Sequence, residues 1–147
     1  MTTSPLTARL QGMVGGSVHL VRLATLVLAV LASAIVWVIA DPLGGANLRA
    51  TGMGGEDVVS IGLGEVFFGF LSWGIGAWVV VMLIERFTSR PKQIWLIIAL
   101  IALLLSFIPV FASSDNGATT FIFIVMHVVS AAIIIPSFAD TIRPKAT

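Results

Sequence analysis

Apolar and polar positions divide the chain into four apolar stretches separated by short polar segments. The apolar stretches cover about residues 18–40, 58–84, 94–112 and 119–139. A helix of ~20 apolar residues is long enough to cross a hydrocarbon core of ~30 Å. The pattern therefore predicts an all-α, polytopic membrane protein with four transmembrane helices.

The segments between the predicted spans carry turn-forming residues. Asp41-Pro42 ends the first span, because the residue before proline avoids helical backbone angles, and a glycine-rich loop follows. The segments ERFTSRPKQ and SSDNGA separate the later spans. We expect residues 1–17 to form a mobile cytoplasmic tail, residues 18–139 the transmembrane domain, and residues 140–147 a second cytoplasmic tail.

Short connections between the spans predict an antiparallel, up-down-up-down four-helix bundle. Lysine and arginine indicate its orientation, because these residues collect on the cytoplasmic side of a membrane. Arg49 alone lies on the side of the first and third connections. The other basic residues flank the opposite ends of the spans: Arg9, Arg22, Arg86, Arg90, Lys92, Arg143 and Lys145. Both termini are therefore expected in the cytoplasm, with Trp37 and Trp95 as interfacial anchors.

Composition supports placement in a membrane and excludes several kinds of chemistry. The chain is 58% hydrophobic and 10% charged, against roughly 45–50% and about 25% in soluble domains. The net charge of +1 gives no basis for nucleic-acid binding by electrostatic attraction. Because cysteine is absent, thiolate nucleophiles, disulfides, iron–sulfur clusters and thiolate zinc sites are excluded. We expect no cofactor and no metal site.

Small residues recur along one face of the second span. Gly62, Glu65, Gly69, Ser72 and Gly76 follow one another at spacings of three and four, which places them on one side of a helix. Small side chains let helices approach closely in lipid. We interpret this side as a helix-packing face that is turned away from lipid.

Glu65 and His127 are ionisable residues inside the second and fourth spans. Counted from Val58 and Thr119, they lie ~10 Å and ~12 Å from the outer side, so they could meet. An isolated charge at the centre of a span costs roughly 2.5–3.5 kcal/mol, so each needs a partner or must be neutral. Three interpretations stay open: a proton-responsive or cation-binding pair in an outward-facing cavity, a hydrogen bond between the second and fourth helices, or two residues that never meet.

Two other polar residues have structural interpretations. Arg22 lies one turn into the first span, and we expect its side chain to extend to the cytoplasmic head groups. His19 lies in the same interfacial zone, where we expect a solvated imidazole.

Several segments together resemble a known family. They are VWVIADPLGG, the glycine-rich second span, ERFTSRPKQIW, LLLSFIPV and MHVVSAAIIIP. They are similar to an uncharacterised family of small four-span membrane proteins that is common in actinobacteria. The resemblance implies four spans and an actinobacterial plasma membrane. It implies no activity, since none is established for the family.

The sequence makes an enzyme the least favoured function. An active site needs a nucleophile, acid, base or metal that converge, and one glutamate, one histidine and scattered serines lack such an arrangement. Compact multidrug exporters also have four spans and one membrane glutamate, but theirs lies in the first helix. Here the first span has no acid. We therefore predict no catalytic residues.

The favoured interpretation is a non-enzymatic accessory or scaffold subunit that packs with itself or with a larger membrane complex. The expected partners are the lipid bilayer and a membrane protein or second copy, and not nucleic acid. The alternative is a small proton-linked transporter or channel that uses Glu65 and His127. Many small residues would serve close helix contacts, within the bundle or between chains. They are Gly69, Ser72, Gly76, Ala99, Ala102, Ala131 and Ala132.

Overall fold

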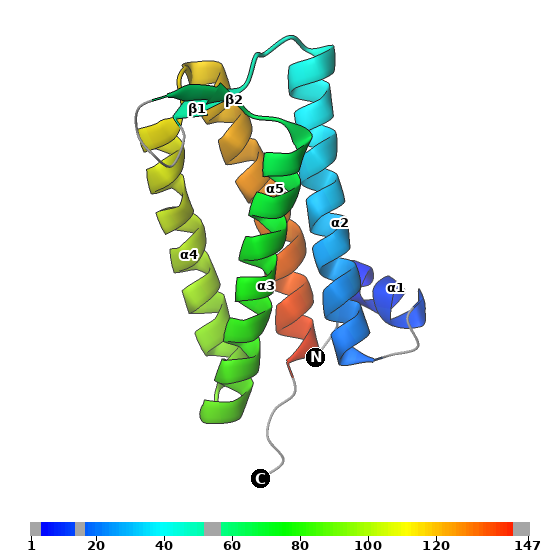
Figure 1. Cartoon of the computed structure of the whole chain (residues 1–147). Coiled ribbons are helices and arrows are strands. Elements are labelled where there is room, and N and C mark those ends of the chain that lie inside the picture. The colour runs from blue at the N-terminus through cyan, green and yellow to red at the C-terminus, as the bar shows by residue number, and fades with distance from the viewer. Residues whose placement is uncertain (1–3, 14–16, 52–56, 143–147) are drawn as a thin grey trace.

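Four long apolar helices make up most of the structure, a computed structural model that describes residues 4–13, 17–51 and 57–142 (Figure 1). Each is long and apolar enough to cross a membrane. This confirms the prediction of a helical membrane protein with four candidate transmembrane helices. They are α2 (Val18–Val38), α3 (Leu63–Phe87), α4 (Pro91–Ser113) and α5 (Gly117–Thr141).

The segment after α2 differs from its prediction. A π-helical turn, η1 (Ile39–Leu43), extends α2 through Pro42, so the first candidate span covers Val18–Leu43. Two short strands follow, β1 (Arg49–Thr51) and β2 (Val58–Ser60), and they pair antiparallel with Arg49 opposite Ser60. The prediction that the second span begins at 58 is therefore wrong. A pair of valines suits a strand as well as a membrane helix, so hydropathy alone did not show the boundary between β2 and the helix that follows.

The β1–β2 hairpin covers one end of the bundle, hereafter the hairpin end (Figure 1). Backbone hydrogen bonds tie it to neighbouring segments: Ile61 N–H donates to Leu48, and Asp115 N–H donates to Arg49. Trp37, near the end of α2, donates its indole N–H to the Ile61 carbonyl at 2.9 Å. These bonds place the starts of α3 and α5 at the same end of the bundle.

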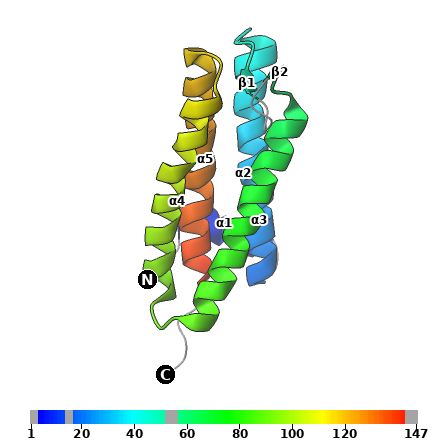
Figure 2. The same ribbon diagram turned by 60° about the vertical axis from the view of Figure 1, so that its left-hand side comes forward.

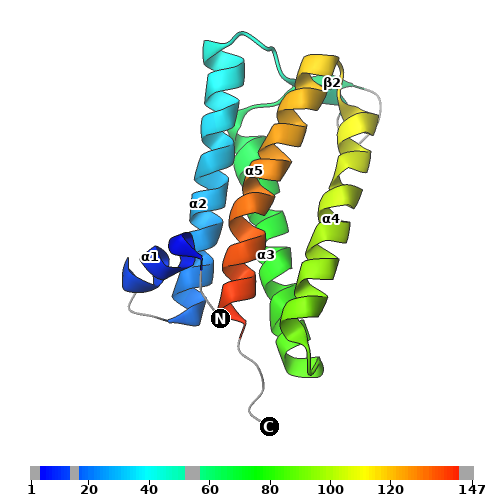
Figure 3. The ribbon, with the colours of Figure 1, turned by 180° about the vertical axis from the view of Figure 1, so that it is seen from behind.

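The N-terminal segment is a short helix rather than a free tail. α1 (Pro5–Met13) begins with Ser4, whose hydroxyl accepts from the Thr7 N–H, and with proline at its first position. Figure 3 shows it against the lower part of α2, where Thr7 and Leu10 are buried. The prediction of a mobile tail is therefore wrong for residues 4–13.

The long helices pack in the ring order α2, α5, α4, α3, with the most extensive contact between α2 and α5. The core includes Leu26, Val81, Trp95 and Phe138. Trp95 is only 2% exposed and donates to the Ile135 carbonyl, so its prediction as an interfacial anchor is wrong. α3 and α4 lie close together at the turn that joins them and diverge toward the hairpin end (Figures 1 and 2).

Candidate functional site

Glu65 lies in the first turn of α3, much nearer the helix end than predicted. Because α3 begins at Leu63, Glu65 is only ~3 Å along the helix axis. Its side chain is exposed, and its Oε2 accepts a hydrogen bond from the Gly62 N–H at 3.0 Å. A glutamate at this position satisfies a backbone donor that the helix leaves unpaired. Glu65 thus has a structural role as a helix cap.

His127 lies in the middle of α5 and faces α3 and α4. It is ~15 Å along the helix axis from Gly117. Its ring lies 5.2 Å from the Phe70 ring and 6.4 Å from the Phe107 ring, measured between centroids. Nδ1 is 2.7 Å from the Phe123 carbonyl oxygen. A carbonyl only accepts, so Nδ1 carries the proton, and in the neutral imidazole Nε2 is then an acceptor.

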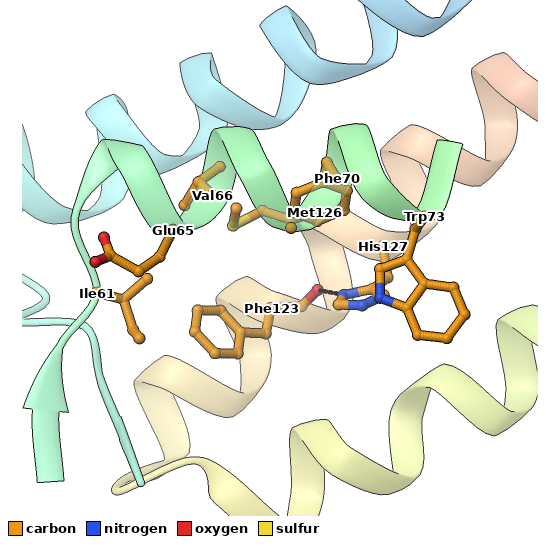
Figure 4. A pocket seen from close by; sticks show the side chains of 9 residues that line it. Ile61, Glu65, Val66, Phe70, Trp73, Phe123, Met126 and His127 are labelled. Atoms are coloured by element: carbon orange, nitrogen blue, oxygen red, sulfur yellow. Dashed lines mark hydrogen bonds between the residues drawn. The ribbon is translucent and has the colours of Figure 1, made fainter. Parts of the chain in front are cut away.

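Glu65 and His127 line the same cavity but do not touch. The cavity has a volume of about 220 Å³ and lies between α3 and α5. Figure 4 shows the two residues at opposite ends of the group of lining side chains, with Phe123 and Met126 between them. No hydrogen bond or salt bridge joins them in the described part of the chain. The prediction that Glu65 and His127 lie at similar depths is wrong, because α3 begins later than predicted. A shared function of the two residues stays a prediction.

A second cavity adjoins the first and shares Phe70, Trp73 and His127 with it. Its volume is about 310 Å³, and it lies between α3, α4 and α5. Apart from His127, the lining is apolar except for Ser106 and Ser130, whose hydroxyls are bonded to Leu103 and Ser33. Four small residues that the sequence assigned to helix contacts line this cavity: Gly76, Ala99, Ala102 and Ala131.

The predicted packing face of α3 makes little contact within the chain. A Cβ atom added at Gly69 or Gly76 would meet no atom within 4 Å. Ser72 is exposed, and Gly62 precedes the helix as its N-cap. Close packing between α2 and α3 uses Gly74 instead, where an added Cβ would lie 2.6 Å from Leu26. A role for Gly62, Gly69, Ser72 and Gly76 in contacts between chains stays a prediction.

Arg22 forms a buried ion pair that the sequence analysis missed. Its side chain is 1% exposed, so the prediction that it extends to the head groups is wrong. The guanidinium donates to both carboxylate oxygens of Glu85, at 2.8 Å and 3.1 Å, and its Nε donates to the Thr141 hydroxyl at 2.9 Å. It also lies over the Phe138 ring. These bonds join α2, α3 and α5 at the end opposite the hairpin.

A second polar cluster at that end is centred on Asp140. Its Oδ2 accepts from the Ser4 N–H at 2.8 Å and from the Thr7 hydroxyl at 3.2 Å. Lys92 contacts its Oδ1 at 3.4 Å. Asp140 therefore holds α1 and α4 to α5. α5 continues to Thr141, two residues past the predicted end of the fourth span, and the start of the cytoplasmic tail stays a prediction.

Comparison with known proteins tests the predicted resemblance to an uncharacterised family. The sequence profile of a family of unknown function, DUF6069, matches residues 14–144. No curated protein and no solved structure matches the chain. The prediction of an uncharacterised family is thus confirmed. Since the match covers all four candidate transmembrane helices, the chain belongs to the DUF6069 family of unknown function.

Proposed function

We propose that the protein is a non-enzymatic accessory or scaffold subunit of an actinobacterial plasma membrane. Its long helices form an antiparallel transmembrane bundle with both termini in the cytoplasm. The distribution of basic residues supports this orientation, because Arg22, Arg86 and Lys92 lie at the end opposite the hairpin and Arg49 lies in the hairpin. The hairpin end then faces the outside.

The main support for the subunit role is the open face of α3, by which we mean the side of this helix that contains Gly69 and Gly76. Gly69 and Gly76 lie inside a helix, where glycine costs up to ~1 kcal/mol relative to alanine. Within the chain they gain no close contact in return, since nothing lies within 4 Å of an added Cβ. In lipid, small residues allow another helix to approach the backbone closely. The occupant we propose for this face is a transmembrane helix of a partner membrane protein.

Purification in mild detergent followed by native mass spectrometry tests the subunit role. We expect a stoichiometric partner with the natural sequence and its loss in Gly69→Leu and Gly76→Leu, which would obstruct the open face. Gly64→Leu is the matched control, because Gly64 is also open but lies on another side of α3. A monomer without partner, or a partner retained equally in all variants, would overturn the proposal. Binding of a second copy through the same face would identify the partner as another molecule of this protein, in a homodimer.

The cavity shared by Glu65 and His127 favours a second candidate function, a small proton-linked transporter or channel. Both residues line this space, and it lies near the hairpin end at the Glu65 side. Proton flux into liposomes that contain only this protein is the test. Flux that stops in Glu65→Gln would support transport and contradict the purely structural role. The absence of flux would leave the subunit role as the remaining proposal.

A further inference from the structure

The two adjoining cavities form one elongated site with a polar end and an apolar end. They meet at Phe70, Trp73 and His127. Glu65 lines the end nearer the hairpin, with its carboxylate directed toward the start of α3 (Figure 4), and the other end lies between Trp95 and Ile135. A site of this shape, within helices that suit a membrane, matches a molecule with a small polar head and an alkyl tail.

The polar end offers hydrogen-bond acceptors and negative charge. Glu65 uses Oε2 for the Gly62 N–H, and within the described chain its Oε1 has no hydrogen bond. At the junction with the second cavity, His127 donates from Nδ1 to the Phe123 carbonyl, so Nε2 of the neutral ring is an acceptor. Among the described residues that line the two cavities there is no lysine or arginine. This end is therefore complementary to a cationic group that donates hydrogen bonds.

Aromatic rings strengthen the preference for a cation. Phe123 lies on the Glu65 side of this cavity, whereas Phe70 and Trp73 lie toward His127 (Figure 4). The faces of such rings carry partial negative charge and attract ammonium groups within about 6 Å. An anionic or neutral head group would gain nothing from this attraction, and an anion would also be repelled by Glu65. The rings and the carboxylate thus favour the same class of head group.

We infer that this site binds an ammonium-bearing amphiphile, with the ammonium between Glu65 and the Phe123 ring and the alkyl chain extending past His127 into the cavity between α3, α4 and α5. The ammonium can belong to a bilayer phospholipid or to a free single-chain amine. The site goes beyond the subunit role. Gly69 and Gly76 line its two cavities, so a partner helix on this face of α3 would cover the site, but Glu65→Gln changes the amphiphile site and leaves both glycines in place. Binding of the amphiphile and loss of a partner are therefore separate results.

Dodecylamine titrated into the purified full-length protein, followed by native mass spectrometry, tests the head group. Dodecanol and dodecyl sulfate are the neutral and anionic comparisons with the same tail. We expect the amine to bind at least about tenfold more tightly than either, because hydrogen bonds to charged groups are the stronger ones. Lengthening the amine should tighten binding by about fourfold per methylene until the cavity is full. Equal binding of all three heads would overturn the inference.

Two variants assign the binding to this site. Glu65→Gln should weaken amine binding about tenfold or more. Glutamine can still accept from the Gly62 N–H, so the start of α3 is preserved. Asp57→Asn is the matched control, since it removes the same charge from an exposed position that lines neither cavity. Equal losses in the two variants, or no loss in Glu65→Gln, would contradict a site at Glu65.

A lipid-retention experiment distinguishes the two sources of the ammonium. The protein is reconstituted into vesicles of phosphatidylethanolamine and phosphatidylglycerol, extracted again, and its retained lipids are weighed by native mass spectrometry. Selective retention of phosphatidylethanolamine that is lost in Glu65→Gln identifies a bilayer lipid. Amine binding without such retention identifies a single-chain ligand. Retention of phosphatidylglycerol in preference to phosphatidylethanolamine would overturn the inference.

Discussion

Removing one partner of the Arg22–Glu85 pair is expected to destabilise the bundle, because the guanidinium left behind is buried. Arg22 is 1% exposed, whereas the Glu85 side chain is 25% exposed. Breaking a fully buried pair costs ~3–5 kcal/mol. Partial access of water to Glu85 and the remaining bond from Nε to Thr141 lower this figure. We therefore expect Glu85→Gln to reduce the free energy of unfolding by about 2–3 kcal/mol.

A double-mutant cycle measures the coupling between these two side chains. The variants are Glu85→Gln, Arg22→Met and their combination, unfolded reversibly in mixed micelles and followed by tryptophan fluorescence. The double variant should cost at least ~2 kcal/mol less than the sum of the single variants, since neither charge is then left alone. Arg90→Met removes an exposed charge at the same end and should change stability by at most ~0.5 kcal/mol. Additive costs in the cycle would refute the buried pair.

Three further predictions use other contacts. Gly74→Ala should lower the free energy of unfolding by up to about 2 kcal/mol in the same assay, because overlap of its Cβ with the buried Leu26 side chain costs about 1–3 kcal/mol and alanine in a helix returns up to ~1 kcal/mol; a gain of about 1 kcal/mol, as expected at an open helical site, would contradict the close α2–α3 packing. Asp140→Asn should raise hydrogen exchange in α1 while α4 stays protected through most of its length, since the carboxylate holds the start of α1; unaltered exchange in α1 would argue against this anchor. Glu65→Gln and His127→Ala should have additive effects on stability, because the side chains do not touch; coupling above ~0.5 kcal/mol would show that they meet.

Hydropathy predicted the candidate transmembrane helices well, because length and apolar character decide this property without tertiary contacts. It failed at the start of α3. Val58, Val59 and Ile61 continue the apolar run, yet strand pairing with Arg49–Thr51 takes Val58 and Val59 out of the helix. This error moved Glu65 too deep by about one and a half turns in the prediction. A cavity lined by both residues was one of the three interpretations left open, and no hydrogen bond or salt bridge joins Glu65 and His127 in the described part of the chain.

Contacts between distant segments account for the other differences. A residue such as Arg22 near the start of a span can extend to the head groups or form an ion pair with a partner. Its partner Glu85 was not recognised, because it belongs to a segment interpreted as a turn. An acid on the same predicted side of the membrane as Arg22 was the available signal. α1 was missed because its anchor, Asp140, lies near the other end of the chain. Sequence spacing on one helix carries no information on such pairings.

Single-cysteine labelling tests the transmembrane arrangement most directly, because the natural chain contains no cysteine. Asp115 and Ser89 are exposed positions in the connections α4–α5 and α3–α4. In intact cells, a membrane-impermeant maleimide should label Asp115→Cys, while Ser89→Cys should react only after the membrane is permeabilised. Labelling of Ser89→Cys in intact cells would contradict the proposed orientation, and labelling of both would contradict a membrane between them.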